Sequence, residues 1–536
     1  MSPAYITKRL DHLGLVAGFN KEIGLAAIID QELGTSERQK ISYGQLFEAM
    51  ILNGLGFTGR TLHMYSEYFD DKPVERLLGE GIESSYINDD SLGRCLDALY
   101  DKGVSQLYQQ IGEKVTGHLG LSCEVINKDS SSFHFDGKGN SDEDDPQAIH
   151  ITKGYSRDHR PDLNQVVLNL ICENQAGIPI YMQGANGNSN DMEGFQKIVK
   201  AHIGSLKAAH QCRYLVADAA LYVADTIKEL ASLLQLFITR VPQKLKESKA
   251  LIQRAPELTF EAINDDYEGV WHDSEYAGVK QKWLLIRSKH ATKRERHLLD
   301  KRMLKQAEQS RKTFKKLCQK EFACAEDAKA AVEQWQEKQP TVALEDIEIV
   351  TMPVYKSAGR PKAGEIPVRQ YYQIDGQLCT PLSKRKEELE QIGLFILATN
   401  DISGELAMEK MLSTYKSQQM VEKGFRFLKS PDFLTSGFYL KKPERIEALL
   451  MVMTTCLMVY AALEHRIRKE LKAQDEYFPD MKKKPTQNPT ARWVFQCFAG
   501  VDVLTVNEAQ TLILNIKDRQ SVIIKILGPI YQKLYS

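Results

Sequence analysis

Two aspartates end predicted strands of the sequence, and their carboxylates could bind metal ions if the strands are neighbours. Asp136 ends SSFHFD, and Asp218 ends RYLVAD. An aspartate at a strand end is commonly a cap or a turn former, so either residue alone indicates little. Two such aspartates, with a third carboxylate on a helix packed beside them, would bind two divalent cations. A pair of ions of this kind catalyses phosphoryl transfer by activating the attacking oxygen and stabilising the leaving one.

A third candidate carboxylate lies in YKSQQMVEKGFRFLK, residues 415–429, where the spacing of apolar residues predicts a helix. At about 100° per residue, Val421, Phe425 and Leu428 form one face. The neighbouring face carries a tyrosine, an amide, a carboxylate and two cations: Tyr415, Gln418, Glu422, Arg426 and Lys429. A solvated face with i,i+4 charge pairs is an alternative explanation of this stripe.

The elements that must position these residues follow the order β-β-β-α-β-α-β from about residue 126 to 241. The five predicted strands are SSFHFD, LNQVVLNLIC, GIPIYM, RYLVAD and LFITRV. This is the order of the ribonuclease H-like fold, so we expect an α/β protein built on a mixed sheet. In that fold the first and fourth strands are neighbours, which would set Asp136 beside Asp218.

The remaining segments flank or interrupt this core. Residues 1–125 carry apolar residues at helical spacing and predict an all-helical domain for DNA binding or dimerisation. Residues 242–392 predict a β-rich insertion with a basic helical segment, since Lys282–Phe322 contains 14 Lys and Arg against 4 acids. That segment is either a solvated helix face or a phosphate contact. The second part of the core, 393–475, holds the glutamate helix, and a tail follows over 476–536.

The composition is ordinary for a soluble globular protein, with 43% hydrophobic and 26% charged residues. The 70 Lys and Arg against 71 Asp and Glu give a net charge of −1, which argues against nucleic-acid binding by bulk charge but allows local basic patches. The apolar run at 448–463 is short for a membrane span, so we expect a buried core helix and no membrane partner. Nine scattered cysteines and a start without a signal segment predict reduced thiols in the cytoplasm.

The chain resembles the DDE transposases of bacterial insertion sequences, in the branch with the pattern Y-x2-R-x3-E-x6-K. Tyr415, Glu422 and Lys429 stand at those spacings, with Gln418 in place of the arginine. HFDGKG is similar to the segment around the first aspartate of that family, and VADAALY to the segment around the second. GYSRDHRPDLNQVVLNL looks like the second-strand region of one large subgroup. The resemblance covers most of the chain, including the N-terminal helical segment.

The resemblance implies that Asp136, Asp218 and Glu422 are catalytic and bind two Mg²⁺ ions, for which Mn²⁺ can substitute. It also implies DNA contacts by the neighbours of the glutamate on its stripe: Tyr415, Gln418, Arg426 and Lys429. Arg157, His159 and Arg160 form a basic turn near the same edge, and they either contact DNA or are a plain polar turn. We interpret His134 as structural and the acidic run 141–145 as a solvated loop.

We therefore expect an enzyme that binds terminal inverted repeats and cuts DNA by metal-dependent hydrolysis. It would then join the 3′-hydroxyl ends to target DNA, as a homodimer on DNA in the cytoplasm. One alternative is a catalytically inert DNA-binding protein derived from a transposase. Another is a nuclease with the same fold that does not join ends.

Overall fold

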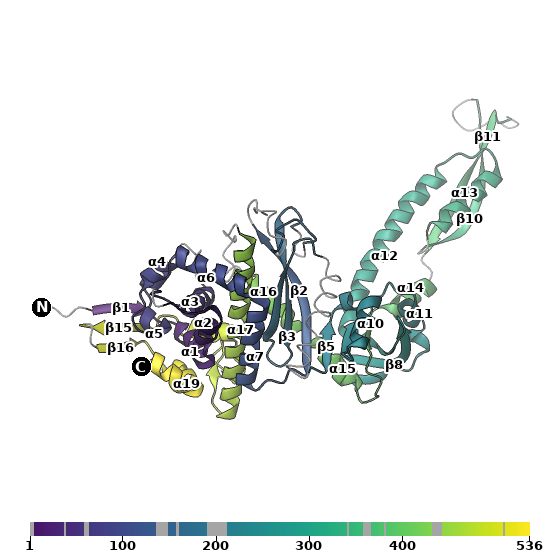
Figure 1. Cartoon of the computed structure of the whole chain (residues 1–536). Coiled ribbons are helices and arrows are strands. Elements are labelled where there is room, and N and C mark those ends of the chain that lie inside the picture. Colours follow the sequence, from purple (N-terminus) through teal and green to yellow (C-terminus); the bar gives the residue numbers. More distant parts are fainter. Residues whose placement is uncertain are drawn as a thin grey trace. The chain divides into compact units, whose positions relative to one another are not determined.

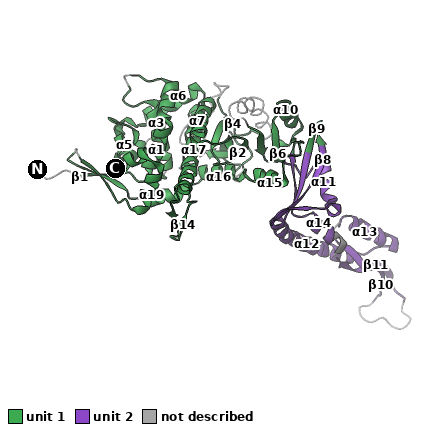
Figure 2. Ribbon diagram, turned by 90° about the horizontal axis from the view of Figure 1, so that it is seen from below, with its two compact units in different colours: residues 1–239, 275–281, 399–536 green, residues 240–274, 282–398 purple. Residues whose placement is uncertain are grey.

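A computed structural model describes eleven stretches of the chain: residues 5–36, 39–57, 64–135, 148–156, 160–189, 212–339, 342–356, 366–379, 382–430, 442–507 and 510–536. The chain divides into two compact units (Figure 2). Unit 1 takes residues 1–239, 275–281 and 399–536, and unit 2 takes residues 240–274 and 282–398.

The sheet of unit 1 has the strand order β4-β3-β2-β5-β6. Its strands are β2 (Val125–Phe135), β3 (Asn164–Glu173), β4 (Pro179–Ala185), β5 (Tyr214–Ala217) and β6 (Leu236–Arg240). β2, β3 and β4 are antiparallel, while β5 is parallel to β2 and β6 is parallel to β5. Helix α10 (Ala224–Ser232) joins β5 to β6. This order confirms the predicted α/β class with a ribonuclease H-like mixed sheet, and the helix predicted before β5 lies outside the described residues.

Helices cover one face of this sheet because the strands are too apolar to face water. Nine of the ten residues of β3 are buried, and α7 (Val104–Leu119) and α17 (Pro443–Ala473) pack on β4 beside it. Figure 1 shows α7 and α17 next to β3. The Tyr108 hydroxyl crosses this layer and donates to the Pro179 carbonyl over 3.0 Å. The same face therefore anchors α17, which packs on β4.

The N-terminal segment is mainly helical, as predicted, but it does not form a unit of its own. Its helices are α1 (Leu13–Ile23), α2 (Leu25–Leu33), α3 (Tyr43–Leu55), α4 (Tyr65–Asp70), α5 (Val74–Leu78), 3₁₀ helix η2 (Ser84–Tyr86), α6 (Asp89–Lys102) and α7. They share one hydrophobic core with α17 and with the C-terminal helices α18 (Ala491–Cys497), α19 (Asp518–Leu527) and α20 (Pro529–Leu534). The segment that we expected to be a tail is thus part of this core.

A strand at the beginning of the described chain departs from the all-helical prediction. β1 (Tyr5–Arg9) pairs with β15 (Asp502–Val506), which pairs in turn with β16 (Gln510–Leu514). Nearby, the small face of α1 admits two C-terminal rings: a Cβ added at Gly14 or Gly18 would lie 2.7 Å from the ring of Tyr535 or Tyr531. Two-residue strands β13 (Phe478–Pro479) and β14 (Pro485–Thr486) complete this part.

Among the described helices, α17 has the length and apolarity of a membrane span, yet 78% of its most apolar window is buried inside the protein. It is a core helix, which agrees with the expectation from its sixteen-residue apolar run. All nine cysteines are free thiols.

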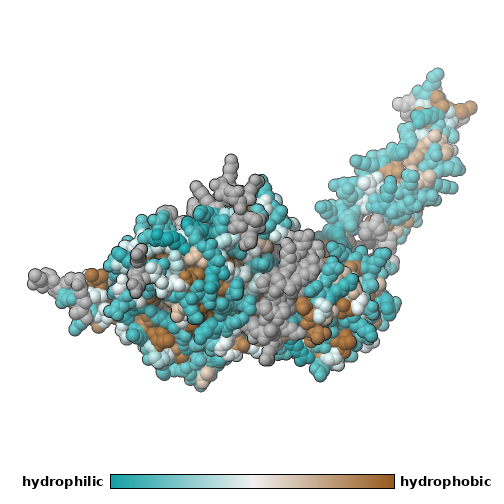
Figure 3. Space-filling model, in the orientation of Figure 1, coloured by the Kyte–Doolittle hydropathy of each residue, from teal (hydrophilic) through white to brown (hydrophobic). Residues whose placement is uncertain are grey.

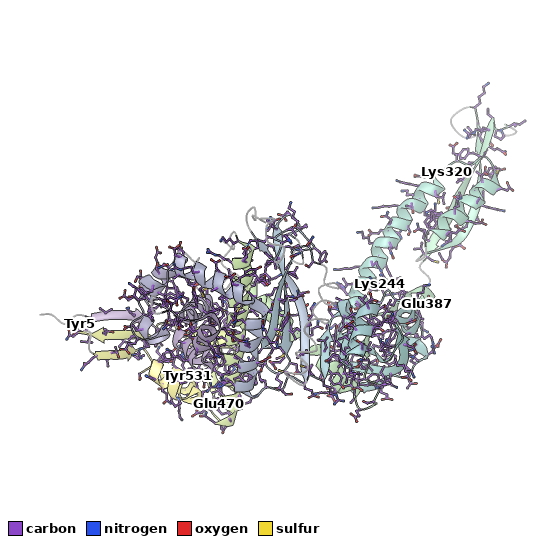
Figure 4. The ribbon with its side chains drawn as sticks, in the orientation of Figure 1. Tyr5, Lys244, Lys320, Glu387, Glu470 and Tyr531 are labelled. Atoms are coloured by element: carbon purple, nitrogen blue, oxygen red, sulfur yellow. The ribbon has the colours of Figure 1, made fainter. Side chains whose placement is uncertain are left out.

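Unit 2 contains a sheet of order β12-β9-β8-β7 and a helical hairpin. The strands are β7 (Glu261–Asn264), β8 (Tyr267–Tyr276), β9 (Val279–Ser288) and β12 (Leu394–Thr399), with α11 (Lys246–Gln253), η5 (Ala255–Glu257) and α14 (Leu382–Gln391) around them. The hairpin comprises α12 (Lys289–Cys318) and α13 (Ala325–Glu337), which pack on β10 (Ala343–Val354) and β11 (Arg369–Cys379). Phe314, Phe322, Ala328 and Ile374 form its own small core. Lys320, labelled in Figure 4, directly follows α12.

Candidate active site

The register of two parallel strands decides which carboxylates lie side by side. Val125, Ile126 and Asn127 of β2 pair with Tyr214, Leu215 and Val216 of β5. Two residues beyond the Asn127–Val216 pair, the register brings Asp129 level with Asp218. Because side chains alternate along a strand, Asp129 points to the same face of the sheet as Asn127. The aspartate of β2 that is level with Asp218 is therefore Asp129.

Asp136 lies outside the described residues, but the strand that precedes it does not support its predicted place. We expected the ends of the first and fourth strands to lie side by side. Instead, β5 pairs only with the beginning of β2, which continues to Phe135. Phe135 is about 20 Å further along the strand than Asp129, at about 3.3 Å per residue. The expectation about the strand ends is wrong because the first strand is longer than its fourth-strand partner.

Asp218 begins a turn at the end of β5 and is exposed. Its Oδ1 accepts a hydrogen bond from the backbone N–H of Ala220 over 3.0 Å, which caps the 3₁₀ helix η4 (Ala219–Leu221). The buried hydroxyl of Thr239 on β6 donates to the Asp218 carbonyl over 2.7 Å. These two bonds orient the residue from both sides and leave its carboxylate open to solvent.

Glu422 lies on the second of two helices, where the sequence predicted one. α15 (Met408–Lys416) ends before Ser417, and α16 (Gln419–Leu428) begins after Gln418. Between them the backbone makes i,i+3 bonds, from Gln418 N–H to the Tyr415 carbonyl over 3.2 Å and from Val421 N–H to the Gln418 carbonyl over 3.0 Å. Such bonds tighten the helix to the 3₁₀ form. At the same point the Ser417 hydroxyl donates to the Thr414 carbonyl. Serine side chains typically compete in this way with backbone N–H groups for carbonyl acceptors.

The two ends of α16 are anchored along β2. At its beginning the Ser417 hydroxyl lies 3.1 Å from Oδ1 of the buried Asn127, and just after its end the Lys429 Nζ lies 5.6 Å from the ring centre of Phe133. The helical span between these anchors is about 18 Å, at 1.5 Å per residue. The corresponding span of strand is about 20 Å. The helix therefore runs beside β2 in the same direction, and Glu422 is level with Asp129.

The side of α16 that carries Glu422 faces away from β3. Met420 packs against Gly177, whose added Cβ would lie 3.1 Å from the Met420 Cβ, in the turn between β3 and β4. Glu422 is about 200° further around the helix than Met420, so it points to the opposite side. β5 lies on that side of β2. The strand register and the helix placement therefore put Asp129, Asp218 and Glu422 at the same level across the sheet.

These carboxylates fit a divalent metal in donor type and in their level on the sheet. Mg²⁺ prefers hard oxygen ligands; Asp218 and Glu422 offer exposed carboxylates, and Asp129 a half-buried one. Within the described ranges no three His, Cys, Asp or Glu side chains converge closely enough to hold one ion. Like charges repel at close range, so these carboxylates would need a cation between them to approach further.

The predicted DNA-contacting residues have different surroundings. Arg426 is exposed on α16, Tyr415 is half-buried on α15, and Lys429 lies over Phe133. Gln418 is only 7% exposed, so its side chain is buried in the described structure, and its phosphate contact stays a prediction. Its carbonyl accepts the helical bond at the α15–α16 junction.

The basic turn before β3 is described only in part. Arg157 and His159 lie outside the described residues, as does the acidic run 141–145. Arg160 forms a bidentate pair with Asp162, with Nε–Oδ1 and Nη2–Oδ2 distances of 2.9 and 2.8 Å. A phosphate would have to compete with that carboxylate. His134 Nε2 lies 3.2 Å from the Ser156 hydroxyl, which agrees with a structural histidine.

Asp129 is the functional candidate that the sequence reasoning missed, and a signal for it exists. In NKDSSSFHFD the polar residues Asn127 to Ser132 precede the alternating phenylalanines. Burying polar groups in a central strand is costly unless they are paired or functional. A polar run inside the first strand therefore indicates the site more directly than an aspartate at its end. Ser417 and Thr239 gave no such signal, because their contacts join segments that lie far apart in the chain.

Comparison with known proteins gives a family match to most of this region. A family model described as "Transposase DDE domain" matches residues 126–459, more than half of the chain, and a model of a domain of unknown function matches residues 5–113. No curated protein matches the chain. A solved structure, "Cryo-EM structure of piggyBac transposase synaptic complex with hairpin DNA", is similar over 92% of this chain and 82% of that one. It has 10% sequence identity and a TM-score of 0.38, and at those values the likeness adds nothing to the strand order.

Proposed function

We propose that this protein cuts DNA at the terminal inverted repeats of an insertion sequence and joins those ends to target DNA. The premise is that the chain belongs to the transposase DDE-domain family. The observation that carries this proposal is the alignment of Asp129, Asp218 and Glu422 on neighbouring elements of a ribonuclease H-like sheet. Asp218 and Glu422 are exposed and Asp129 is half-buried, so the three side chains are open to ligands. They have the donor set that DNA phosphoryl transfer requires.

In this proposal Asp129 and Asp218 hold the first of two divalent cations, and Glu422 completes the site of the second. When bound, the ions supply the activation of a water or a 3′-hydroxyl and the stabilisation of the leaving oxygen. Mg²⁺ is the expected ion because all the donors are carboxylates, and Mn²⁺ can substitute. The hydrogen bonds from Ala220 and Thr239 orient Asp218, and the Ser417–Asn127 bond sets the level of Glu422.

DNA binding is proposed to use local basic surfaces, since the net charge is −1. The surface along α12 is mostly hydrophilic (Figure 3), and this helix carries eleven Lys and Arg against three acids. Two of those acids are already engaged, because Asp300 pairs with Arg385 over 3.0 Å and Glu295 accepts from the Gly393 N–H over 2.7 Å. The excess positive charge of α12 is therefore available to phosphates. Arg426 and Lys429 would contact DNA nearer to the cut.

Two transposon ends must be brought together before joining, so we propose a homodimer on DNA in the cytoplasm. The test is cleavage and joining of DNA that carries the inverted repeats flanking the gene, with Mg²⁺ or Mn²⁺. Wild type should cut at the repeat boundary and form joined products, while Asp218→Asn and Glu422→Gln should bind the repeats without cutting them.

The same assay separates the alternatives. Cutting without joined products would identify a nuclease of this fold. Repeat binding without cutting under either metal would identify an inert DNA-binding protein, and the enzyme proposal would then be abandoned.

A further inference from the structure

A groove of about 550 Å³ lies on the side of α16 that faces away from the three carboxylates. Its apolar floor includes Met420, Phe427, Leu457 and Tyr460, from α16 and α17. The rings of Phe427 and Tyr460 lie against each other, with centres 4.5 Å apart and an interplanar angle of 30°. The floor is thus a rigid aromatic surface fixed by two packed helices.

The rim of the groove is basic. Lys423 projects from α16, and Arg468, Lys469 and Lys472 project from the C-terminal half of α17, where Glu470 is labelled in Figure 4. Glu464 is the one carboxylate among the lining residues, and it is already bonded to Arg468 over 2.7 Å and to the Ala491 N–H over 2.8 Å. The lysines therefore dominate the potential of the groove.

His465 also lines the groove, beside the same cations. Burial, followed by the charges of Lys469 and Arg468, lowers the pKa of His465 from its usual value. A neutral imidazole surrounded by cations indicates a surface that would gain from an anionic ligand. No described acidic side chain of the lining other than Glu464 offsets this charge.

Consecutive residues of α16 place this groove next to the candidate active site. Glu422 and Lys423 differ by about 100° around the helix, so the carboxylate faces β5 and the ammonium faces the groove. A ligand in the groove would lie about one helix diameter, roughly 10 Å, from the carboxylates. A polymeric substrate could reach both surfaces, whereas a small molecule could not.

We propose that this groove binds an unpaired strand of DNA, with a base on the Phe427–Tyr460 surface and its phosphates on Lys423 and Lys472. The proposal rests on the proposed function only in that DNA is the substrate. Proteins that bind single strands combine a basic groove with aromatic rings on which bases stack, and the volume of this groove suits one or two nucleotides but not a duplex. Duplex DNA would meet the rim without entering.

The test is fluorescence anisotropy of the full chain with a labelled oligothymidylate and, separately, with the repeat duplex, over a series of salt concentrations. The Lys423→Gln/Lys472→Gln variant should bind the single strand about tenfold more weakly. The slope of log K against log salt should fall by about 1.4, since each single-strand phosphate contact contributes about 0.7. Duplex binding should change less than about twofold. The matched control, Lys114→Gln/Lys533→Gln, removes two exposed charges elsewhere in unit 1 and should keep the wild-type slope.

A slope for the groove variant equal to that of the control would overturn the proposal. Equal losses for duplex and single strand would also overturn it, because the lysines would then follow duplex phosphates. Cleavage by wild type is measured in parallel. Single-strand binding that depends on the groove, without repeat cleavage, would leave this proposal standing while the proposed function fails.

Discussion

Asn127 pairs with Val216 across two parallel strands, and this register sets Asp129 beside Asp218. The same residue, Asn127, also contacts the glutamate helix, because its side-chain Oδ1 lies 3.1 Å from the hydroxyl of Ser417, which precedes α16. One buried asparagine therefore touches both elements whose carboxylates must meet. Several expected outcomes depend on this relationship.

Asp129→Asn should abolish cleavage, while Asp136→Asn should leave most of it. Replacing a metal ligand should lower the cleavage rate more than about 100-fold, since even the partners of ligands are worth about 10–100-fold. Rates are measured on repeat DNA with saturating Mg²⁺, and repeat binding is measured for each variant. Loss of cleavage in Asp136→Asn with retention in Asp129→Asn would contradict the assignment from strand register.

Ser417→Ala should destabilise the protein and slow cleavage together. It removes the bond to Asn127, whose Nδ2 already has no partner in the described structure. An unpaired buried amide costs about 1–3 kcal/mol, which urea unfolding can detect. The control is Ser413→Ala on α15, an exposed serine whose hydroxyl donates to the Lys410 carbonyl. If Ser413→Ala had the same effect as Ser417→Ala, the anchor would have no special role.

Thr239→Val should slow cleavage while leaving repeat binding unchanged. The variant keeps the shape of the buried side chain but leaves the Asp218 carbonyl without its 2.7 Å donor, at a cost of about 1 kcal/mol. Thr226→Val is the matched control, because the Thr226 hydroxyl is also buried and has no partner in the described structure. That substitution should be neutral or stabilising. If cleavage by Thr239→Val depended on metal concentration as cleavage by wild type does, the role of Thr239 in positioning Asp218 would be contradicted.

Stability should fall as the pH rises from about 4.5 to 7, and Glu48 should account for part of the loss. Burial raises the pKa of Glu48 to about 7, although Lys21 and the Ala26 N–H oppose the shift. In this range the unfolded chain releases the Glu48 proton and the folded protein keeps it, so the folded state loses stability as the pH rises. The full effect is about 3 kcal/mol.

Glu48→Gln tests this dependence, because glutamine keeps the hydrogen-bonding shape without the titration. Urea unfolding at pH 5 and pH 8 should show that the free energy of unfolding of the variant, relative to wild type, is higher at pH 8 than at pH 5. The exposed Glu113→Gln variant should follow wild type throughout. An unchanged pH dependence in Glu48→Gln would exclude this residue as the source.

Much of the fold could be predicted because its signals are local. The apolar runs of β3 and α17 predicted buried elements, and the Y-x2-Q-x3-E-x6-K spacing led to Glu422. Asp218 could be predicted because β5 is short, so the end of this strand lies at the candidate active site. Asp129 was missed because the alternation of Phe133 and Phe135 marks only the second half of an eleven-residue strand, which drew attention to Asp136 at its end. The residue at which the partner strand ends is set by the tertiary structure and cannot be predicted from the local sequence.

The break between α15 and α16 shows the same limit. The apolar face of residues 415–429 has helical spacing on both sides of Ser417, so periodicity alone predicts one helix. The tightening at Gln418 accompanies a hydrogen bond to Asn127, 290 residues away in the chain.

The pairing of β1 with β15 has a consequence for synthesis on the ribosome. The N-terminal helices close their core with Tyr531 and Tyr535, and Arg76 donates to the Leu534 carbonyl over 3.0 Å. A nascent chain held at residue 490 lacks these partners, so the side of α1 that packs on α20 stays uncovered for nearly the whole of translation. Contacts of such long sequence separation also slow folding. We expect pulse proteolysis of stalled nascent chains to cut α1 until residue 535 has emerged.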